Sequence, residues 1–332
     1  MNLPKVIQTA IDSLPDPDAT IHADVLSAWD TRTKPIGSLG RLEPLAAQIA
    51  SIQGTRTPRA AQRKVQLFAG CHGITQEGVS LFPDEVNQLM FDNFNTGGAA
   101  ISVICRSAGI GFEAIDAGIQ NATRSFLHEP ALSEVELEQA LLLGWNAVPD
   151  GIDLYAVGEM GIGNTSCASA IAAAVLKCNV DALTGPGVGV DEATRKHKAD
   201  VIARALDHHA DALKHPLDIL RCLGGRELAA MTGAILSTAC KGIPVVLDGV
   251  ISTASAAIAI ETVPALKGYQ IAGHQSQEPA HRYLLDRYEL EPLLQLNMRL
   301  GEGTGAALAM DICQRAVDCF NDMATFESIG LG

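Results

Sequence analysis

The stretch LYAVGEMGIGNTSCASAIAAAVLKC, residues 154–178, decides which fold class the sequence predicts. Its first four residues form a short apolar run typical of a buried parallel strand, and residues 166–178 have the small, apolar composition of a closely packed helix. Glycine-rich residues 158–165 separate the two. Because strand, loop and helix in this order are the repeating unit of α/β proteins, the stretch predicts a parallel sheet covered by helices.

The same alternation continues on both sides of this stretch. Short apolar runs predict three more buried strands, at 65–69, 111–115 and 243–247. Between and beyond them, helical spacing or composition predicts helices at 86–108, 133–143, 193–212 and 227–241. We therefore expect an α/β fold with a mostly parallel sheet and flanking helices.

The two ends of the chain have a different pattern. Residues 1–62 are expected to be helical with a polar break at 14–20, and residues 284–326 are again expected to be mostly helical. The sequence thus predicts a large α/β domain over 63–283. It also predicts a small helical domain built from 1–62 and 284–332 together.

The composition excludes several classes of protein. The 332 residues include 24 Lys and Arg against 38 Asp and Glu, so the formal charge is −14. This acidic balance argues against non-specific binding to nucleic acid or to an anionic membrane. No apolar run approaches the roughly 18 residues that span a bilayer, and the first residues do not resemble a signal peptide. The eight scattered cysteines contain no CxxC pair, which predicts a reduced, cytoplasmic protein without structural zinc.

Glycines follow the predicted strands at the points where α/β proteins bind ligands. Glycine loops follow three of these strands, at 70–73, 158–165 and 248–249, and two more glycine loops occupy 184–189 and 300–305. Because ligands bind beyond the carboxyl ends of parallel strands, these loops predict one shared cleft.

The loop GEMGIGNTS, 158–166, is the strongest candidate for anion binding. Its backbone N–H groups and the positive end of the following helix suit a phosphate or carboxylate, and Asn164 or Thr165 can cap that helix. It is neither a Walker loop nor a GxGxxG fingerprint, and a tight turn with an ordinary cap is the alternative. Glu159 would repel an anion, so we expect it to face a ribose hydroxyl or a cationic ring.

Glu302 lies between two glycines in LGEGTGAALAM, residues 300–310. In apolar surroundings its pKa would rise toward neutrality, as a general base requires. The alternative is a carboxylate that stabilises a helix N-terminus. Arg226 and Glu227 form another charged pair at a predicted helix start, where an ordinary surface ion pair is the favoured interpretation.

Two other clusters have simpler explanations than catalysis. Cys71 and His72 are adjacent, and neighbouring side chains of an extended segment point to opposite faces, so a Cys–His dyad is not expected. His274, Glu278 and His281 lie within eight residues but lack HExxH spacing, so a role in a polar loop is favoured over a metal site.

The ordered set of motifs resembles one known family. The motifs are KPIGSLGRLE (34–43), GCHGI (70–74) with EGVSLFPDEVNQLM (77–90), GGAAI (97–101), GEMGIGNTS (158–166), GPGVGVD (185–191), GGRELAAMTGAIL (224–236), PVVLDG (244–249) and MRLGEGTGAALAM (298–310). Together they are similar to the nicotinate-nucleotide–dimethylbenzimidazole phosphoribosyltransferases, from about residue 30 to residue 326. Each glycine loop alone is weak evidence, but eight in register are strong evidence.

The resemblance implies an activity and an architecture. Members of this family transfer phosphoribose from nicotinate mononucleotide to 5,6-dimethylbenzimidazole, which forms α-ribazole 5′-phosphate for the lower ligand of cobalamin. They need no metal or other cofactor. They combine a Rossmann-like α/β domain with a small helical domain from both chain ends, and they are homodimers.

The resemblance also implies roles for individual residues. Glu302 corresponds to the catalytic base that takes the imidazole proton. The pocket for the aromatic base corresponds to Ser80, Gln88, Met90 and Leu300. The nucleotide and phosphoribose region corresponds to Glu159, Gly161, Gly163, Asn164, Gly187, Gly189 and Lys198.

The chain departs from the family pattern at a few positions. Cys71 replaces the usual Asp, Ile36 replaces a second Pro, Val188 replaces a common Thr, and SQEPAH at 276–281 replaces SAEPGH. Exchanging Asp for Cys removes a hydrogen-bonding charge near the cleft. One alternative is therefore transfer to another acceptor, such as adenine, a different benzimidazole or a phenol. A second is a paralogue that binds nucleotide or benzimidazole without catalysis.

Overall fold

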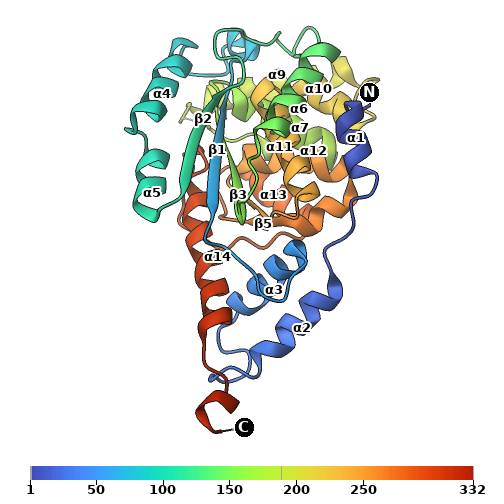
Figure 1. Cartoon of the computed structure of the whole chain (residues 1–332). Helices are drawn as coiled ribbons and strands as arrows, with labels where there is room; N and C mark the ends of the chain where they lie inside the picture. Colours follow the sequence, from blue (N-terminus) through green and yellow to red (C-terminus); the bar gives the residue numbers. More distant parts are fainter. Residues whose placement is uncertain (1, 188, 332) are drawn as a thin grey trace.

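A single sheet of five parallel strands lies at the centre of the molecule (Figure 1). The computed structural model describes residues 2–187 and 189–331. The strands are β1 (Arg63–Ala69), β2 (Gly111–Asp116), β3 (Leu154–Met160), β4 (Val245–Leu247) and β5 (Gln270–Ala272). Their order in the sheet is β2-β1-β3-β4-β5, and every neighbouring pair is parallel. The predicted α/β fold and four predicted strands are confirmed, but β2 was expected to be buried and is instead an edge strand whose residues are exposed or half-buried. The three-residue β5 was not predicted.

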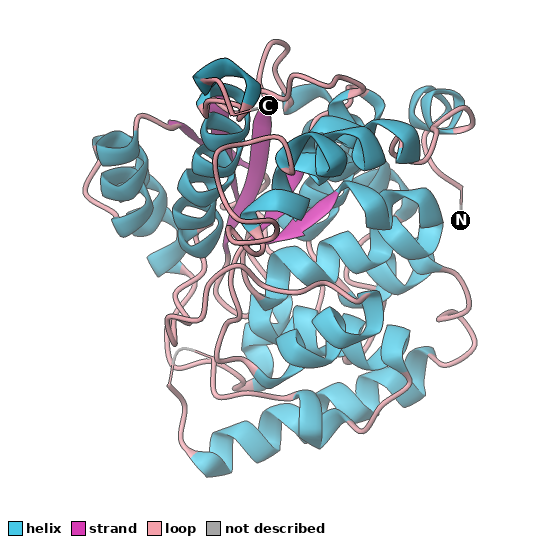
Figure 2. Ribbon diagram, turned by 90° about the horizontal axis from the view of Figure 1, so that it is seen from below, coloured by secondary structure: helices cyan, strands magenta, loops and turns pink. Residues whose placement is uncertain are grey.

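Helices cover both sides of the sheet (Figure 2). The α-helices are α1 (Lys5–Ile11), α2 (Ala19–Trp29), α3 (Leu42–Gln53), α4 (Glu85–Thr96), α5 (Ala100–Ala108), α6 (Glu134–Ala147), α7 (Asn164–Leu176), α8 (Val180–Leu183), α9 (Glu192–His209), α10 (Pro216–Leu223), α11 (Arg226–Cys240), α12 (Val250–Thr262), α13 (Pro279–Tyr288) and α14 (Thr304–Asp322). Short 3-10 turns are η1 (Gly73–Glu77), η2 (Pro264–Tyr269) and η3 (Glu327–Ile329).

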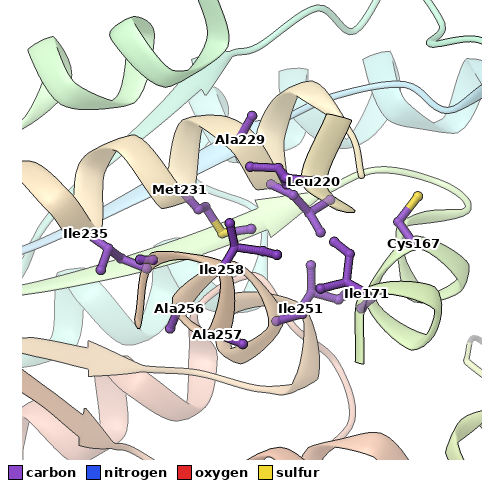
Figure 3. Packing of buried hydrophobic residues seen from close by; sticks show 14 of the residues in the cluster. Cys167, Ile171, Leu220, Ala229, Met231, Ile235, Ile251, Ala256, Ala257 and Ile258 are labelled. Carbon is purple, nitrogen blue, oxygen red and sulfur yellow. The ribbon is translucent and has the colours of Figure 1, made fainter. Parts of the chain in front are cut away.

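Alternating side chains of the central strands build two cores. Tyr155 and Val157 of β3 point into one core, and Leu154 and Ala156 point into the other. The first core contains α6, α7 and α10–α12, where Ile171, Leu220, Met231, Ile251 and Ile258 interdigitate (Figure 3). The second contains α2, α3, α5 and α14. β3 is therefore buried on both faces, as central parallel strands are, whereas no residue of the edge strand β2 is buried.

The chain ends occupy both sides of this arrangement. Helices α2 and α3 pack with α14 below the sheet in the view of Figure 1, whereas α1 packs against α11 in the first core. The division into domains at 63 and 283 remains a prediction. Within the described ranges, no helix combines the length and apolar character that a membrane crossing requires.

Two predicted helical regions differ in the structure. The region 86–108 forms two helices, because Gly97 adopts a φ of 80° after α4 and α5 begins at Ala100. The region 284–326 was expected to be mostly helical, but the chain between α13 and α14 contains no helix. This linking segment, 289–303, instead returns across the carboxyl edge of the sheet. Leu293 and Leu294 donate backbone hydrogen bonds to Ala272 and Gly273 there.

Candidate active site

A cavity of about 320 Å³ lies beyond the carboxyl ends of β3, β4 and β5. This size is at the lower end of the range of ligand pockets, about 300–1,000 Å³. Its walls come from segments that are distant in sequence: the 79–90 region, the loops after β3 and β4, residues 186–198, the loop after β5 and residues 299–302. Four of the five glycine loops predicted to share a cleft line this cavity, at the edge of the sheet where α/β proteins bind ligands, but the loop 70–73 does not.

The loop between β3 and α7 forms one wall. Gly163 turns the chain into α7 with a φ of 97°, and Asn87 of α4 accepts a 2.8 Å hydrogen bond from the Ile162 backbone N–H. Asn164 donates its side-chain amide to Glu159 instead of capping the helix. Asn164 and Thr165 of the first turn of α7 line the cavity, so the positive end of the helix dipole borders it, which favours an anion.

Glu302 is held in a strained backbone conformation at the opposite wall. Its φ is 63°, which non-glycine residues adopt only at a cost of about 1–3 kcal/mol. The Glu302 carbonyl packs closely on Gly158, because a Cβ atom added at Gly158 would lie 2.4 Å from the Glu302 carbonyl oxygen. Oε2 of Glu302 is buried without a hydrogen-bond partner. Burial raises the pKa of Glu302, the nearby Asp248 raises it further, and the backbone N–H of Ile101 opposes the shift.

Asp248 fixes the start of the helix that follows Glu302. Its Oδ1 accepts hydrogen bonds from the backbone N–H groups of Gly305 (2.7 Å) and Ala306 (3.1 Å), and its Oδ2 accepts one from Gly303 (3.2 Å). The sequence analysis did not include Asp248 among the site residues. Asp248 directly follows the predicted strand 243–247, and this position could have identified it as a candidate site residue.

Glu159 completes an acidic group with Glu302 and Asp248. Its Oε1 accepts a 3.4 Å hydrogen bond from the Glu302 backbone N–H. Burial raises the pKa of Glu159 well above its usual value, and repulsion from Asp248 adds to the effect. Three carboxyl groups therefore share one end of the cavity, which suits a ligand whose reacting part carries or develops positive charge.

Two cationic side chains, Lys198 and Arg299, also line the cavity. Lys198 is buried and donates to Thr165 Oγ1 at 2.8 Å, in the first turn of α7. Arg299 Nη1 donates to the Gly187 carbonyl at 3.2 Å. Burial lowers the pKa of Lys198 to about 8, although Glu278 opposes this shift. Two cations and a helix N-terminus are the kind of arrangement that favours an anion.

Glu278 links this basic group to the loop after β5. Its Oε1 accepts a 3.0 Å hydrogen bond from the Gly187 backbone N–H. Burial raises the pKa of Glu278, and Lys198 opposes that shift. His281 holds the same loop, because its Nδ1 accepts the Ser276 backbone N–H at 2.9 Å. Among the residues that the structure describes, no group of three or more His, Cys, Asp or Glu is arranged to hold a metal ion.

Most residues predicted for the site line the cavity. Its lining includes Ser80, Met90, Glu159, Gly161, Gly163, Asn164, Gly187, Lys198, Leu300 and Glu302. Gln88 is not in the lining: it lies on α4 and hydrogen-bonds Asp92 at 2.8 Å and Gln120. Gly189 is not in it either. The roles of all these residues remain predictions, and Arg299, Asp248 and Glu278 join them as lining residues that the sequence analysis missed.

Cys71, Gln277 and Ile36, which depart from the family pattern, do not line the cavity. Cys71 is buried against Asp84 and Asn87 and does not line the cavity. Gln277 points outward to Asn297, and Ile36 is exposed on the α2–α3 connection. Val188 lies outside the described residues.

One interpretation from the sequence is wrong. Arg226 and Glu227 do not form a surface ion pair: Arg226 binds Glu136 at 2.6 Å, and Glu227 is fully buried against His72. Helix α11 begins at Arg226, so consecutive residues diverge and only one of them faces solvent.

The fold and cavity define an α/β protein with a cavity of small-molecule size at the carboxyl edge of its sheet. A family profile described as phosphoribosyltransferase matches residues 14–331, and the chain belongs to this phosphoribosyltransferase family. A nicotinate-nucleotide–dimethylbenzimidazole phosphoribosyltransferase of Cereibacter sphaeroides is 45% identical over 98% of this chain and 96% of its own length. One from Brucella canis is 42% identical over 97% and 95%. The solved structure of CobT from Thermus thermophilus superposes with a TM-score of 0.90, at 37% identity over 94% of this chain and 99% of that one.

Proposed function

We propose that this protein transfers the 5-phosphoribosyl group of nicotinate mononucleotide to 5,6-dimethylbenzimidazole. The products are nicotinate and α-ribazole 5′-phosphate, the lower-ligand precursor of cobalamin. The observation that supports this most directly is that one cavity is lined both by an acidic group, Glu302, Glu159 and Asp248, and by the cations Lys198 and Arg299. The substrate has the complementary pattern, because a pyridinium ring and a phosphate occupy opposite ends of its ribose.

In the chemical step, the benzimidazole is the nucleophile, nicotinate is the leaving group and Glu302 is the general base. One benzimidazole nitrogen attacks the anomeric carbon while the other loses its proton to Glu302. The bond from the anomeric carbon to the pyridinium nitrogen breaks, and its electron pair leaves with nicotinate. Attack opposite the leaving group inverts the β-nucleotide to an α-product. A buried carboxylate with a raised pKa is a suitable base for this proton, and such catalysis contributes about 10²- to 10⁴-fold.

The positively charged transition state is stabilised by the remaining acids. The ribose acquires positive charge as the pyridinium leaves, and Glu159 and Asp248 lie in the cavity wall beside Glu302. Lys198, Arg299 and the start of α7 hold the phosphate and so fix the anomeric carbon between the two rings. Ser80, Met90 and Leu300 provide the mainly apolar wall that suits the incoming aromatic base.

A different acceptor is the second candidate, since Cys71 departs from the family. Cys71 can influence the cavity through Asn87, which holds the Ile162 backbone. The loop 276–281 differs from the family pattern at Gln277 and Ala280. The two residues of this loop that line the cavity are Ser276 and Glu278, and both match the pattern. This favours dimethylbenzimidazole as the preferred acceptor.

A competition assay tests the proposal. The protein is incubated with nicotinate mononucleotide and equimolar dimethylbenzimidazole, unsubstituted benzimidazole, adenine and phenol, and the products are separated by chromatography. We expect α-ribazole 5′-phosphate as the main product. A clear preference for another acceptor would replace the proposal by the second candidate. Nucleotide binding without any product would support a non-catalytic paralogue.

We also propose that the enzyme is a cytoplasmic homodimer. The apolar side chains of Phe82 and Leu300 line the cavity yet are exposed, and Leu81 and Leu89 near Phe82 in the chain are exposed as well. A second copy that covers this rim would remove the apolar surface from water. All eight cysteines are free thiols, in keeping with a reducing compartment. Light scattering during size-exclusion chromatography should give twice the chain mass, whereas the mass of one chain would contradict the dimer.

A further inference from the structure

Beneath the nucleotide loop lies a buried group of three side chains that the proposed mechanism does not use. His72 follows β1, Cys167 lies in the first turn of α7 and Glu227 lies in the first turn of α11. His72 Nε2 is 2.6 Å from Glu227 Oε1, and His72 Nδ1 is 3.3 Å from Cys167 Sγ. All three residues are fully buried and none of them lines the cavity. The arrangement resembles a nucleophilic triad, but its sulfur cannot reach a substrate.

The imidazole ring has a single defined orientation. Burial disfavours a charge on His72, but Cys167 and Glu227 together raise the pKa of His72 well above its usual value. A protonated ring can donate from both nitrogens, one to the carboxylate and one to the sulfur. His72 therefore connects the N-terminal turns of α7 and α11 across the carboxyl edge of the sheet.

The glycine loop rests directly on this ring. A Cβ atom at Gly161 would lie 2.8 Å from His72 Nε2, 3.1 Å from His72 Cδ2 and 3.3 Å from Glu227 Oε1. On the other side, a Cβ atom at Gly225 would lie 2.2 Å from His72 Cε1. Gly161 does not have a positive φ, so its backbone conformation does not require glycine. Glycine is required at 161 because the His72 imidazole leaves no room for a Cβ atom.

We propose that His72, clamped between Cys167 and Glu227, is a positioning residue that sets where loop 161–163 stands in the nucleotide wall of the cavity. The inference deepens the proposed function and rests on it for the identity of the nucleotide. Gly161 and Gly163 both line the cavity, and a Cβ atom added to either would come within 3.4 Å of His72. A shift of the ring therefore moves the start of α7, where the phosphate is expected to bind.

A double-mutant cycle tests this coupling. Gly161→Ala is made in the wild-type enzyme and in His72→Ala, and KM and kcat for nicotinate mononucleotide are measured together with its Kd by calorimetry. In the wild type we expect Gly161→Ala to raise KM and Kd about tenfold with a much smaller effect on kcat, because the methyl group collides with the ring. In His72→Ala, which provides space for the methyl group, the same change should cost less than about threefold.

Two further variants separate positioning from general stability. His72→Gln keeps a donor near Glu227 and should retain a KM closer to wild type than His72→Ala does. Gly249→Ala is the control for the cycle: it changes a glycine in the same cavity wall, but its Cβ would find its nearest neighbour at 3.6 Å, in Ser276. Its effect should be the same in both backgrounds. If His72→Ala does not fold, His72→Asn replaces it, since the shorter amide also withdraws from Gly161.

The outcomes separate the two proposals. Equal effects of Gly161→Ala in both backgrounds, or variants of His72 that lower only the melting temperature, would overturn the positioning role. If the wild type binds nicotinate mononucleotide but transfers nothing, the proposed function fails, and the coupling is still read from Kd. A chain that does not bind this nucleotide contradicts both proposals.

Discussion

At the scale of single residues, the chemistry depends on how Glu302 is held. Two glycines flank it, its φ is positive, and Asp248 binds the N–H groups of the helix that follows. These restraints keep its carboxyl group in a buried position where one oxygen has no hydrogen-bond partner. A free, desolvated carboxylate oxygen is what a general base needs, since nothing must be displaced before it accepts a proton.

Replacing Glu302 by Gln should remove the base with little change in shape. We expect kcat to fall by about 10²- to 10³-fold, while KM for nicotinate mononucleotide changes by less than about threefold. Because the base acts in its deprotonated form and its pKa is raised, kcat/KM of the wild type should fall on the acid side at a pH above the usual Glu value of about 4.3. Steady-state kinetics between about pH 4.5 and about pH 9 measure both effects. Equal losses in kcat and in nucleotide binding would argue against a base.

At the scale of elements, the closest helix contact is that of α6 with α11. Glycines bring the two backbones together: a Cβ atom at Gly144 would lie 1.7 Å from the Ala230 carbonyl oxygen, and one at Gly233 would lie 2.0 Å from that of Leu141. Periodicity predicts both helices, but it does not show that they meet at their glycines. Only the packing of the first core decides this.

Gly144→Ala tests that contact. Alanine is the better helix former by about 1 kcal/mol, so an exposed site would be stabilised. Here we expect the free energy of unfolding to fall by about 1–3 kcal/mol, because the methyl group would force α6 away from α11. Urea unfolding measures the difference. Glu138→Ala on the exposed side of α6 is the control and should change stability by less than about 0.5 kcal/mol. A stabilised Gly144→Ala would show that the helices are not in contact there.

At the scale of the whole molecule, the acidic end of the cavity lowers the stability of the free enzyme. Glu159, Asp248 and Glu302 are buried near one another, and the pKa values of Glu159 and Glu302 are raised by burial first and by Asp248 second. A raised carboxyl pKa contributes stability that is fully present below the unfolded value of about 4.3 and is lost as pH rises through the folded value. The free enzyme should therefore become less stable as pH increases over this range.

Glu159→Gln should reveal this effect. Because it removes a buried charge, the variant should be more stable than the wild type at about pH 8, and the difference should shrink toward about pH 4.5, where Glu159 regains its proton. Urea unfolding of the ligand-free proteins at the two pH values provides the comparison. A variant that is less stable at the higher pH, or a difference that grows on acidification, would contradict this account.

Much of the fold was predictable from local patterns. Apolar runs predicted four of the five strands. For β1, β3 and β4 the reason is that buried parallel strands are apolar on both faces, whereas β2 has an apolar run but is an exposed edge strand. β5 was not predicted because its three residues, QIA, begin with a polar side chain, whereas the equally short β4 lies within the apolar run 243–247. The region 86–108 was expected as one helix because Gly97 and Gly98 interrupt an otherwise continuous helical pattern without changing its period.

The sequence by itself determined the α/β class, the glycine loops and the prominence of Glu302 and Glu159, because each depends on residues close together in the chain. Only the tertiary structure decided that Glu278 reaches Gly187 across 91 residues, and that Asp248 holds the helix that follows Glu302. It also decided that His72 meets Glu227 across 155 residues. Contacts of this kind arise when separate strands end at one edge of a sheet, and no local pattern encodes which side chains then face each other.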